Sequence, residues 1–226
     1  MQTFIKSAAL FEDMIIIWVL GGTLFLFVLF LLFWRLYFLR DPERTIPEGK
    51  SIVSPADGKV IAVFRTDEAE KVVRKRFLGK IRTLVKEVGE NCTIISIFMS
   101  PMDVHINRSP ITGTVKRITH TPGSFKAVTG IDEGLMNEKT EVLLDTAIGK
   151  VKVIQIAGLV ARRIVTWIRE GDETLKGERF GLINLGSQLI VIIPDSYRVK
   201  GKKKDITVTI TKGERVRAGE SILARF

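Results

Sequence analysis

The chain has 226 residues, enough for one membrane segment plus one domain, or for a single large domain. Its 35 Lys and Arg against 25 Asp and Glu give a net charge of +10, which favours an anionic partner: nucleic acid, an acidic substrate or an anionic lipid surface. The one cysteine, Cys92, excludes an intramolecular disulfide and a cysteine-cluster metal site, and its apolar neighbours predict a buried strand thiol.

The first predicted element is a transmembrane helix over residues 14–34, inside an N-terminal segment of residues 1–34. This stretch has no charged residue and consists mostly of Ile, Leu, Phe and Val. As a helix it would be ~30 Å long, which is the thickness of the hydrocarbon core of a bilayer. A cleaved signal peptide is the alternative, but Glu12 and Asp13 precede the stretch and no small-residue cleavage site follows it.

The charges around this helix predict its orientation. Arg35, Arg40 and Arg44 follow it, whereas Lys6 alone precedes it. The positive-inside rule therefore predicts a single-pass protein of the cell membrane with its C-terminal domain in the cytoplasm. A domain held at a membrane, without a zinc-finger, recognition-helix or RNA-binding signature, is not expected to bind nucleic acid. The basic stretch 198–204 is either a contact for anionic headgroups or a solvated loop between strands.

Residues 35–50 predict an ordered linker, because two prolines and a glycine in it exclude a long helix. Residues 51–226 predict a catalytic domain that is mainly β with a minor α contribution, because short β-branched runs alternate there with Gly, Pro, Asn and Asp. For residues 68–87 three structures remain open: a helix, a long hairpin, and an excursion that lies against the membrane. The expected strands are residues 59–64, 93–98, 113–118, 141–144, 151–156, 189–193 and 206–211.

Two segments indicate a barrel-sandwich-like architecture for this domain. Residues 54–60 resemble the opening strand of biotinyl and lipoyl carrier domains. Residues 212–220, with glycines flanking an apolar residue before a final strand, resemble a later part of those domains. The lysine of a Met-Lys-Met hairpin is missing, so the resemblance concerns the architecture and not a swinging arm.

A Gly-Ser step, Gly186-Ser187, stands at the start of the most apolar run in the domain. A serine hydroxyl can attack an unhindered glycine carbonyl, which turns the amide into an ester, and elimination then leaves a pyruvoyl group. His105 and His120 are the only histidines and so the candidates for a general base. By default, Asp57 is a residue that forms a turn. The functional alternative is that its carboxylate orients a histidine that acts as the general base.

Several short motifs, taken together from Arg35 to Phe226, resemble the phosphatidylserine decarboxylase family in its short, membrane-anchored form. Each motif is short, but all of them occur in the family's order. They are residues 38–44, Ser54-Pro55-Ala56-Asp57-Gly58, residues 99–110, Pro122-Gly123-Ser124-Phe125, Asn137-Glu138-Lys139, residues 176–181 and Leu185-Gly186-Ser187.

This resemblance implies a proenzyme that cleaves itself between Gly186 and Ser187, giving a β chain of residues 1–186 and an α chain of residues 187–226. Ser187 would become the pyruvoyl cofactor, which forms a Schiff base with the substrate amine, and no metal or external cofactor would be needed. Asp57 and His105 match the family residues that assist cleavage. The two chains would form a heterodimer or a higher oligomer of it. The substrate would be a membrane phospholipid, either phosphatidylserine or an archaeal serine ether lipid, and the products its ethanolamine lipid and CO2.

Two positions depart from the family pattern: Arg108 stands where long forms carry a second histidine, and Gln188 stands where many members carry Thr. His105 is then expected to serve both in cleavage and in protonation after decarboxylation. Two other functions remain alternatives. One is a membrane-anchored serine hydrolase using Asp57, His105 and Ser187, although the Gly-x-Ser-x-Gly pattern is absent. The other is a non-enzymatic carrier or adaptor domain.

Overall fold

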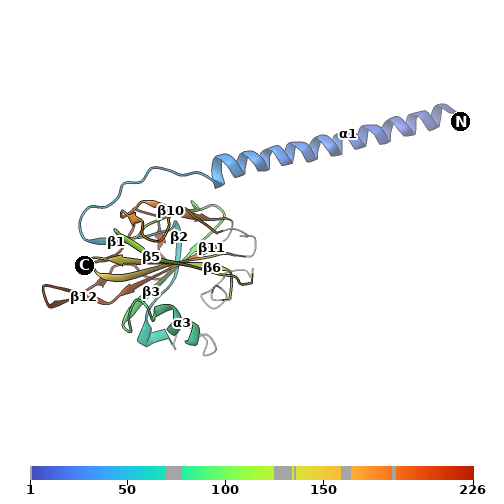
Figure 1. Ribbon diagram of the computed structural model, residues 1–226. Coiled ribbons are helices and arrows are strands. Elements are labelled where there is room, and N and C mark those ends of the chain that lie inside the picture. Colours follow the sequence, from blue (N-terminus) through green and yellow to red (C-terminus); the bar gives the residue numbers. More distant parts are fainter. Residues whose placement is uncertain (1, 70–77, 125–133, 135, 159–163, 185–186) are drawn as a thin grey trace. The chain divides into compact units, whose positions relative to one another are not determined.

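The computed structural model describes residues 2–69, 78–124, 134, 136–158, 164–184 and 187–226, with side chains described from residue 14 onward. The chain divides into two compact units, Met1–Arg40 and Asp41–Phe226 (Figure 1). Each unit has its own physical character. The first is a single long helix, and the second has strands as its main regular structure.

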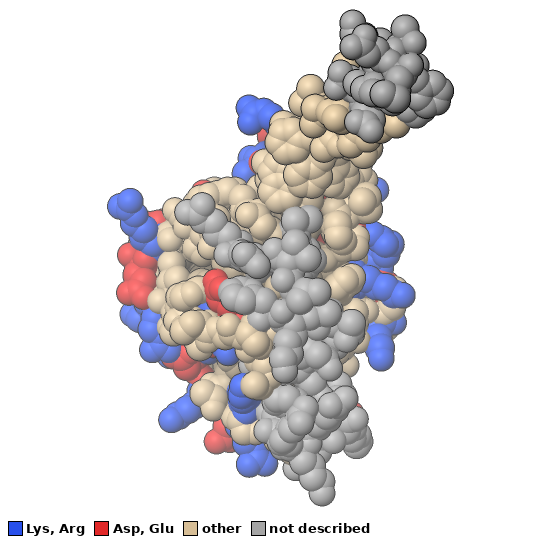
Figure 2. Space-filling view, turned by 90° about the vertical axis from the view of Figure 1, so that its right-hand side faces the viewer, with Lys and Arg blue, Asp and Glu red and all other residues tan. Residues whose placement is uncertain are grey.

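The N-terminal unit consists of helix α1 (Gln2–Leu32), which continues as the π-helix η1 (Phe33–Phe38). Its part Met14–Phe38 is long and apolar enough to cross a membrane, and Figure 2 shows mainly uncharged side chains on the face of the helix that is in view. Aromatic rings stack at its end, with 4.6 Å between the ring centroids of Trp34 and Phe38. The Arg40 guanidinium lies 4.0 Å from the centre of the Tyr37 ring. Aromatic rings and arginine at the end of an apolar helix are typical of a membrane–water interface.

An eight-stranded antiparallel sheet dominates the second unit, so the prediction of a mainly β domain is confirmed. Its strand order is β15-β2-β3-β11-β7-β6-β5-β9. Two three-stranded sheets, β1-β16-β14 and β4-β10-β8, and the hairpin β12-β13 complete the unit. The strands are β1 (Ser51–Val53), β2 (Gly58–Arg65), β3 (Cys92–Met99), β4 (Ile106–Arg108), β5 (Gly113–Thr121), β6 (Lys139–Thr146), β7 (Gly149–Ile156), β8 (Ile164–Thr166), β9 (Glu173–Thr174), β10 (Arg179–Ile183), β11 (Ser187–Pro194), β12 (Ser196–Val199), β13 (Lys202–Asp205), β14 (Thr207–Val208), β15 (Arg215–Val216) and β16 (Ile222–Arg225).

Strand β11 lies in the middle of the large sheet, and both of its faces are buried. Its side chains alternate between two apolar clusters, as the period of a strand requires. Leu189, Val191 and Ile193 belong to the main core, whereas Ile190 and Ile192 belong to a second cluster. Burial on both faces explains why this run is continuously apolar instead of alternating.

The second cluster is covered by helix α3 (Leu78–Val85), which packs Ile81, Leu84 and Val85 against the sheet. The 3₁₀-helix η2 (Thr66–Glu68) comes shortly before it in the chain. A helix thus occupies the end of the segment 68–87 for which three structures were open, while residues 70–77 lie outside the described residues.

Lys152, buried on the same face, forms ion pairs of 2.8 Å with Glu87 and 3.0 Å with Glu141. These pairs tie the chain just after α3 to the sheet.

The expected strand 206–211 is only partly right, because β14 ends at Val208 and Thr211 donates its backbone N–H to the Glu214 side chain. The basic stretch 198–204 lies mostly in the exposed hairpin β12-β13, where Lys200 and Gly201 both have positive φ, as a tight hairpin turn requires. Cys92 is a buried strand thiol as predicted, and burial raises its pKa to about 12.

Candidate active site

Ser187 is the first residue of β11 and is completely buried. It pairs in register with Met99 of β3, and its hydroxyl oxygen lies 3.4 Å from the Met99 sulfur. Strand alternation turns Ser187 toward the main core, the same side as Leu189. The residue proposed to react is therefore held by a central strand and shielded from solvent. Leu185 and Gly186, the other two residues of its motif, lie outside the described residues.

Gln188, the second departure from the family pattern, points to the opposite face of the sheet. Its amide nitrogen lies 2.5 Å from the Ser96 hydroxyl. A Cβ atom built on Gly134 would strike the Gln188 amide oxygen, so a larger residue there would require this side chain to move. Gln188 thus fixes the sheet face under α3 and is separated from the Ser187 side chain by the backbone of β11.

His105 lies one residue before β4 and is almost completely buried. Its Nδ1 is 2.9 Å from the backbone oxygen of Asp103. A proton on Nδ1 would be donated to that oxygen, which leaves the lone pair of a general base on Nε2. The Asp103 carboxylate accepts hydrogen bonds from the Ser100 backbone and hydroxyl and pairs with Arg215 at 2.7 Å, so the loop that orients His105 is itself fixed.

Asp57 lies in the turn between β1 and β2, and its contacts differ from those of a histidine-orienting carboxylate. It accepts two hydrogen bonds from Arg44, of 2.8 and 3.0 Å, and one of 2.7 Å from the backbone N–H of Ala218. Arg44 also approaches Glu220 at 3.4 Å. We call Arg44, Asp57, Ala218 and Glu220 the linker clamp. Among the described atoms, no hydrogen bond joins Asp57 to His105 or His105 to Ser187.

The turn that carries Asp57 nevertheless contacts the strand that follows His105. The backbone N–H of Arg108 donates to the Pro55 carbonyl, 2.9 Å away and two residues before Asp57. The Arg108 guanidinium binds the carbonyl oxygens of Gly177 and Pro42 and the carboxylate of Asp41. Burial and the nearby Arg179 charge lower the pKa of Arg108, while Asp41 opposes this shift. An arginine in this setting keeps its proton and holds the linker, so it does not replace a histidine as a proton-transfer group.

Three further residues, Met99, Asn107 and Gln155, belong to the site and were not singled out from the sequence. The Met99 sulfur contacts the Ser187 hydroxyl and also the Asn107 amide nitrogen, at 3.8 Å. Gln155 donates to the Asn107 amide oxygen at 2.9 Å. The signal in the sequence was a single uncharged polar side chain in each of two strands, Asn107 in β4 and Gln155 in β7. This geometry brings the motif of residues 99–110 directly against Ser187.

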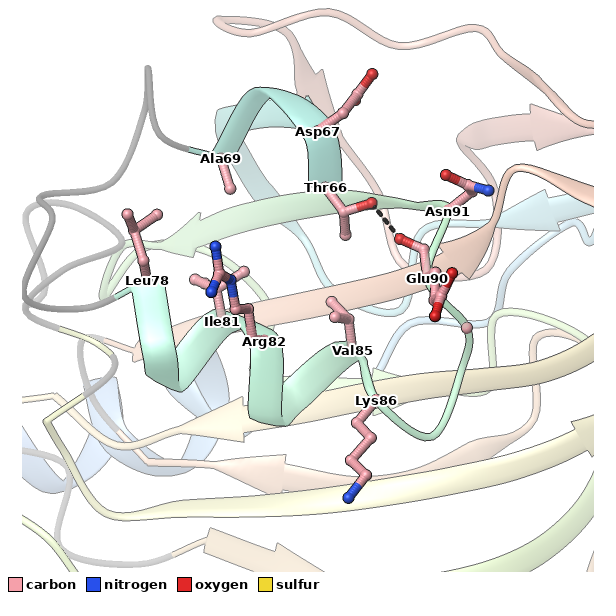
Figure 3. A pocket seen from close by; sticks show the side chains of 11 residues that line it. Thr66, Asp67, Ala69, Leu78, Ile81, Arg82, Val85, Lys86, Glu90 and Asn91 are labelled. Carbon is pink, nitrogen blue, oxygen red and sulfur yellow. Dashed lines mark hydrogen bonds between the residues drawn. The ribbon is translucent and has the colours of Figure 1, made fainter.

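One pocket of the unit lies away from these residues. It has a volume of about 530 Å³ and lies between η2 and α3, with Ile81, Val85 and Arg82 among its lining residues (Figure 3). The Thr66 hydroxyl closes one side by donating to the Glu90 carbonyl at 2.6 Å. Ser187, His105 and Asp57 do not line it. Pocket size alone therefore does not locate the chemistry, and the polar contacts around Ser187 do.

Comparison with known proteins gives the family. A family model described as phosphatidylserine decarboxylase matches residues 31–224. A phosphatidylserine decarboxylase proenzyme of Syntrophus aciditrophicus is 41% identical over 192 residues, which cover 84% of this chain and 78% of that protein. The proenzyme of Chlorobaculum tepidum is 39% identical, over 87% of this chain and 79% of the relative. The chain belongs to the phosphatidylserine decarboxylase family, a family of decarboxylases within the lyases.

Proposed function

We propose that this chain is a self-processing, pyruvoyl-dependent decarboxylase that converts phosphatidylserine, or a serine ether lipid with the same headgroup, to the ethanolamine lipid and CO2. The observation that carries this proposal is the placement of Ser187. It is the first residue of a central strand, completely buried, and it directly follows the glycine at which the family motif would be cleaved. The names of the relatives supply the substrate and the word proenzyme.

Cleavage begins with attack of the Ser187 hydroxyl on the Gly186 carbonyl carbon. His105 takes the hydroxyl proton on Nε2, the serine nitrogen leaves the carbonyl with a proton, and an ester replaces the amide. Loss of the Ser187 α-proton then breaks the ester bond, which leaves a carboxylate on Gly186 and an enamine at position 187. One water molecule converts the enamine to a ketone and releases ammonia, so no external oxidant or metal takes part.

The residues around position 187 fit a group made from the chain itself. The group needs no entry path, and the pairing of β11 with β3 and β7 holds the new N-terminus in place after the backbone is cut. A pyruvoyl ketone supplies an electrophile that binds the substrate amine and accepts the electron pair left when CO2 departs. His105 then returns a proton to the α-carbon. Asp57 acts at a distance in this proposal, because its turn holds β4 through the Pro55–Arg108 bond.

The assembly and the location of the protein are part of the same proposal. Residues 187–226 supply both the central strand β11 and the strand β16 that pairs with β1, so the two chains would remain one folded heterodimer. We propose that the N-terminal helix keeps this heterodimer at the cell membrane with the catalytic unit on the cytoplasmic side. A lipid substrate that never leaves the bilayer is then always close to the enzyme.

Intact-mass spectrometry of the purified chain, together with a lipid decarboxylation assay, tests the proposal. We expect two fragments, residues 1–186 and 187–226, the second lighter by one ammonia than a chain that begins with serine. Ser187→Ala should remain one inactive chain, and the control Ser196→Ala should be processed normally. An uncleaved wild-type chain that reacts with a fluorophosphonate would instead identify a serine hydrolase. An uncleaved and inactive chain would favour the carrier or adaptor function.

A further inference from the structure

Two amide side chains, Asn107 and Gln155, are completely buried beside the apolar main core. Burying an amide costs free energy unless each of its polar atoms finds a partner. Gly181 lies against both the neighbouring strand and one of these amides: a Cβ atom there would strike the Val165 backbone oxygen and would also lie 3.2 Å from the Gln155 amide nitrogen. The fold thus accommodates a polar feature at this place, and its contacts lead directly to Ser187.

The contacts form a chain that we call the polar relay: Thr166, Gln155, Asn107 and Met99. The Thr166 hydroxyl donates to the Gln155 amide oxygen at 3.2 Å. The Gln155 amide nitrogen donates to the Asn107 amide oxygen at 2.9 Å, and the Asn107 amide nitrogen donates to the Met99 sulfur at 3.8 Å. The same sulfur accepts the Ser187 hydroxyl.

The chemistry of the last member fixes the direction of the whole relay. A thioether sulfur carries no hydrogen and can only accept, so Asn107 must turn its NH2 group toward Met99. The Asn107 amide oxygen then faces Gln155, so Gln155 must donate a hydrogen bond to it from its own NH2 group. The Gln155 oxygen in turn requires the donor that the Thr166 hydroxyl provides. Every donor therefore points toward position 187.

A thioether is a weak acceptor, and two donors end on it in the uncleaved chain. If Ser187 becomes a ketone, position 187 loses its donor and gains a much stronger acceptor. We propose that Asn107 donates its amide hydrogen to this carbonyl oxygen, and that Gln155 and Thr166 are positioning residues that keep the amide turned toward it. This inference rests on the proposed function and adds a donor that polarises the reactive carbonyl.

Thr166→Val gives the sharpest test, because it removes one hydroxyl at the half-buried end of the relay and nothing next to Ser187. We expect complete cleavage, a fall in kcat of about fivefold with KM unchanged, and a similarly slower reaction of the processed protein with phenylhydrazine, which probes the carbonyl without lipid. Thr166→Ser should restore both rates. Thr174→Val is the matched control, because its buried hydroxyl contacts Ser109 and not the relay.

Asn107→Leu removes the donor itself, and we expect normal cleavage with kcat and the phenylhydrazine rate lowered by ~100-fold. The inference is overturned if Thr166→Val and Asn107→Leu keep wild-type rates in both assays. It is also overturned if a folded Asn107→Leu chain stays uncleaved, because Asn107 would then act before the carbonyl exists. Failure of the proposed function looks different: the wild-type chain itself would remain uncut and unreactive toward phenylhydrazine.

Discussion

The two ends of the segment 187–226 are held to the rest of the catalytic unit by opposite means. At its start, β11 is wedged between β3 and β7 and buries apolar side chains on both faces. Toward its end, charged and polar contacts add to the packing of β16 in the main core: Arg215 pairs with Asp103, Asp57 binds Ala218, and Arg44 approaches Glu220. The apolar end positions the reacting serine, and the ionic end ties the segment to the linker behind the membrane helix.

This difference explains where the candidate catalytic residues lie. His105 is buried and close in the chain to the Met99 and Asn107 contacts with the apolar end, whereas Asp57 belongs to the ionic end. We therefore expect substitutions at the two ends to have effects of different kinds. Changes near β11 should alter chemistry and core stability, and changes in the linker clamp should alter how firmly the segment is held.

The largest effect is expected for His105→Ala. Loss of a general base typically lowers a rate by ~100-fold or more, so uncleaved chain should accumulate over hours in a time course followed by gel. His120→Ala is the control, because His120 is exposed and its ring contacts Thr140. Cleavage of His105→Ala at the wild-type rate would remove His105 from the mechanism.

A large loss of stability is expected for Leu189→Ala, which opens a cavity next to Ser187 in the main core. The full-length Ser187→Ala background keeps the chain in one piece, and urea unfolding in detergent should show a loss of about 2–5 kcal/mol. Leu175→Ala, at a mostly exposed leucine, should cost less than about 0.5 kcal/mol. Equal losses for the two variants would contradict the assignment of β11 to the core.

A smaller loss is expected for Arg44→Gln, which breaks the linker clamp. The Arg44 and Asp57 side chains are 7% and 13% exposed, so the pair is largely shielded from water. In the same background we expect a loss of about 2 kcal/mol, which lies within the range for a hydrogen bond to a charged group. Arg65→Gln, which breaks a pair with Asp195 at a mostly exposed arginine, should cost less than about 1 kcal/mol. If Arg44→Gln costs no more than Arg65→Gln, the clamp does not hold the segment.

The smallest effect is expected at Glu43, an exposed residue of the linker. Its hydrogen bond and charge interaction with Arg179 lower the pKa of Glu43. A lowered folded-state pKa contributes stability above the ordinary carboxylate pKa, and this contribution is lost as the pH falls through the folded value. The free energies of unfolding of wild type and Glu43→Gln should therefore differ slightly at pH 7, and this difference should shrink as the pH falls below the ordinary carboxylate value of 4.5. A difference that grows on acidification would have the wrong sign.

The central strands could be predicted from sequence because a run such as residues 189–193, apolar at every position, is stable only when buried on both faces. Helix α3 could not be predicted from sequence, because its eight residues mix apolar and basic side chains. Which of them are buried becomes clear only when the helix packs on the sheet. Ser187 and His105 could be singled out as reactive types within motifs. The partners of Asp57 and the relay from Thr166 to Met99 could not, because tertiary packing joins residues that lie far apart in the chain.

The mass of the fragment that begins at residue 187 tests the central claim most directly. Purified wild-type chain, analysed by intact-mass spectrometry with and without prior reduction by borohydride, should contain residues 187–226 with a pyruvoyl N-terminus. Borohydride should then add two hydrogens to that fragment and to no other. A single chain of residues 1–226, or a fragment that begins with an unmodified serine, would contradict the account.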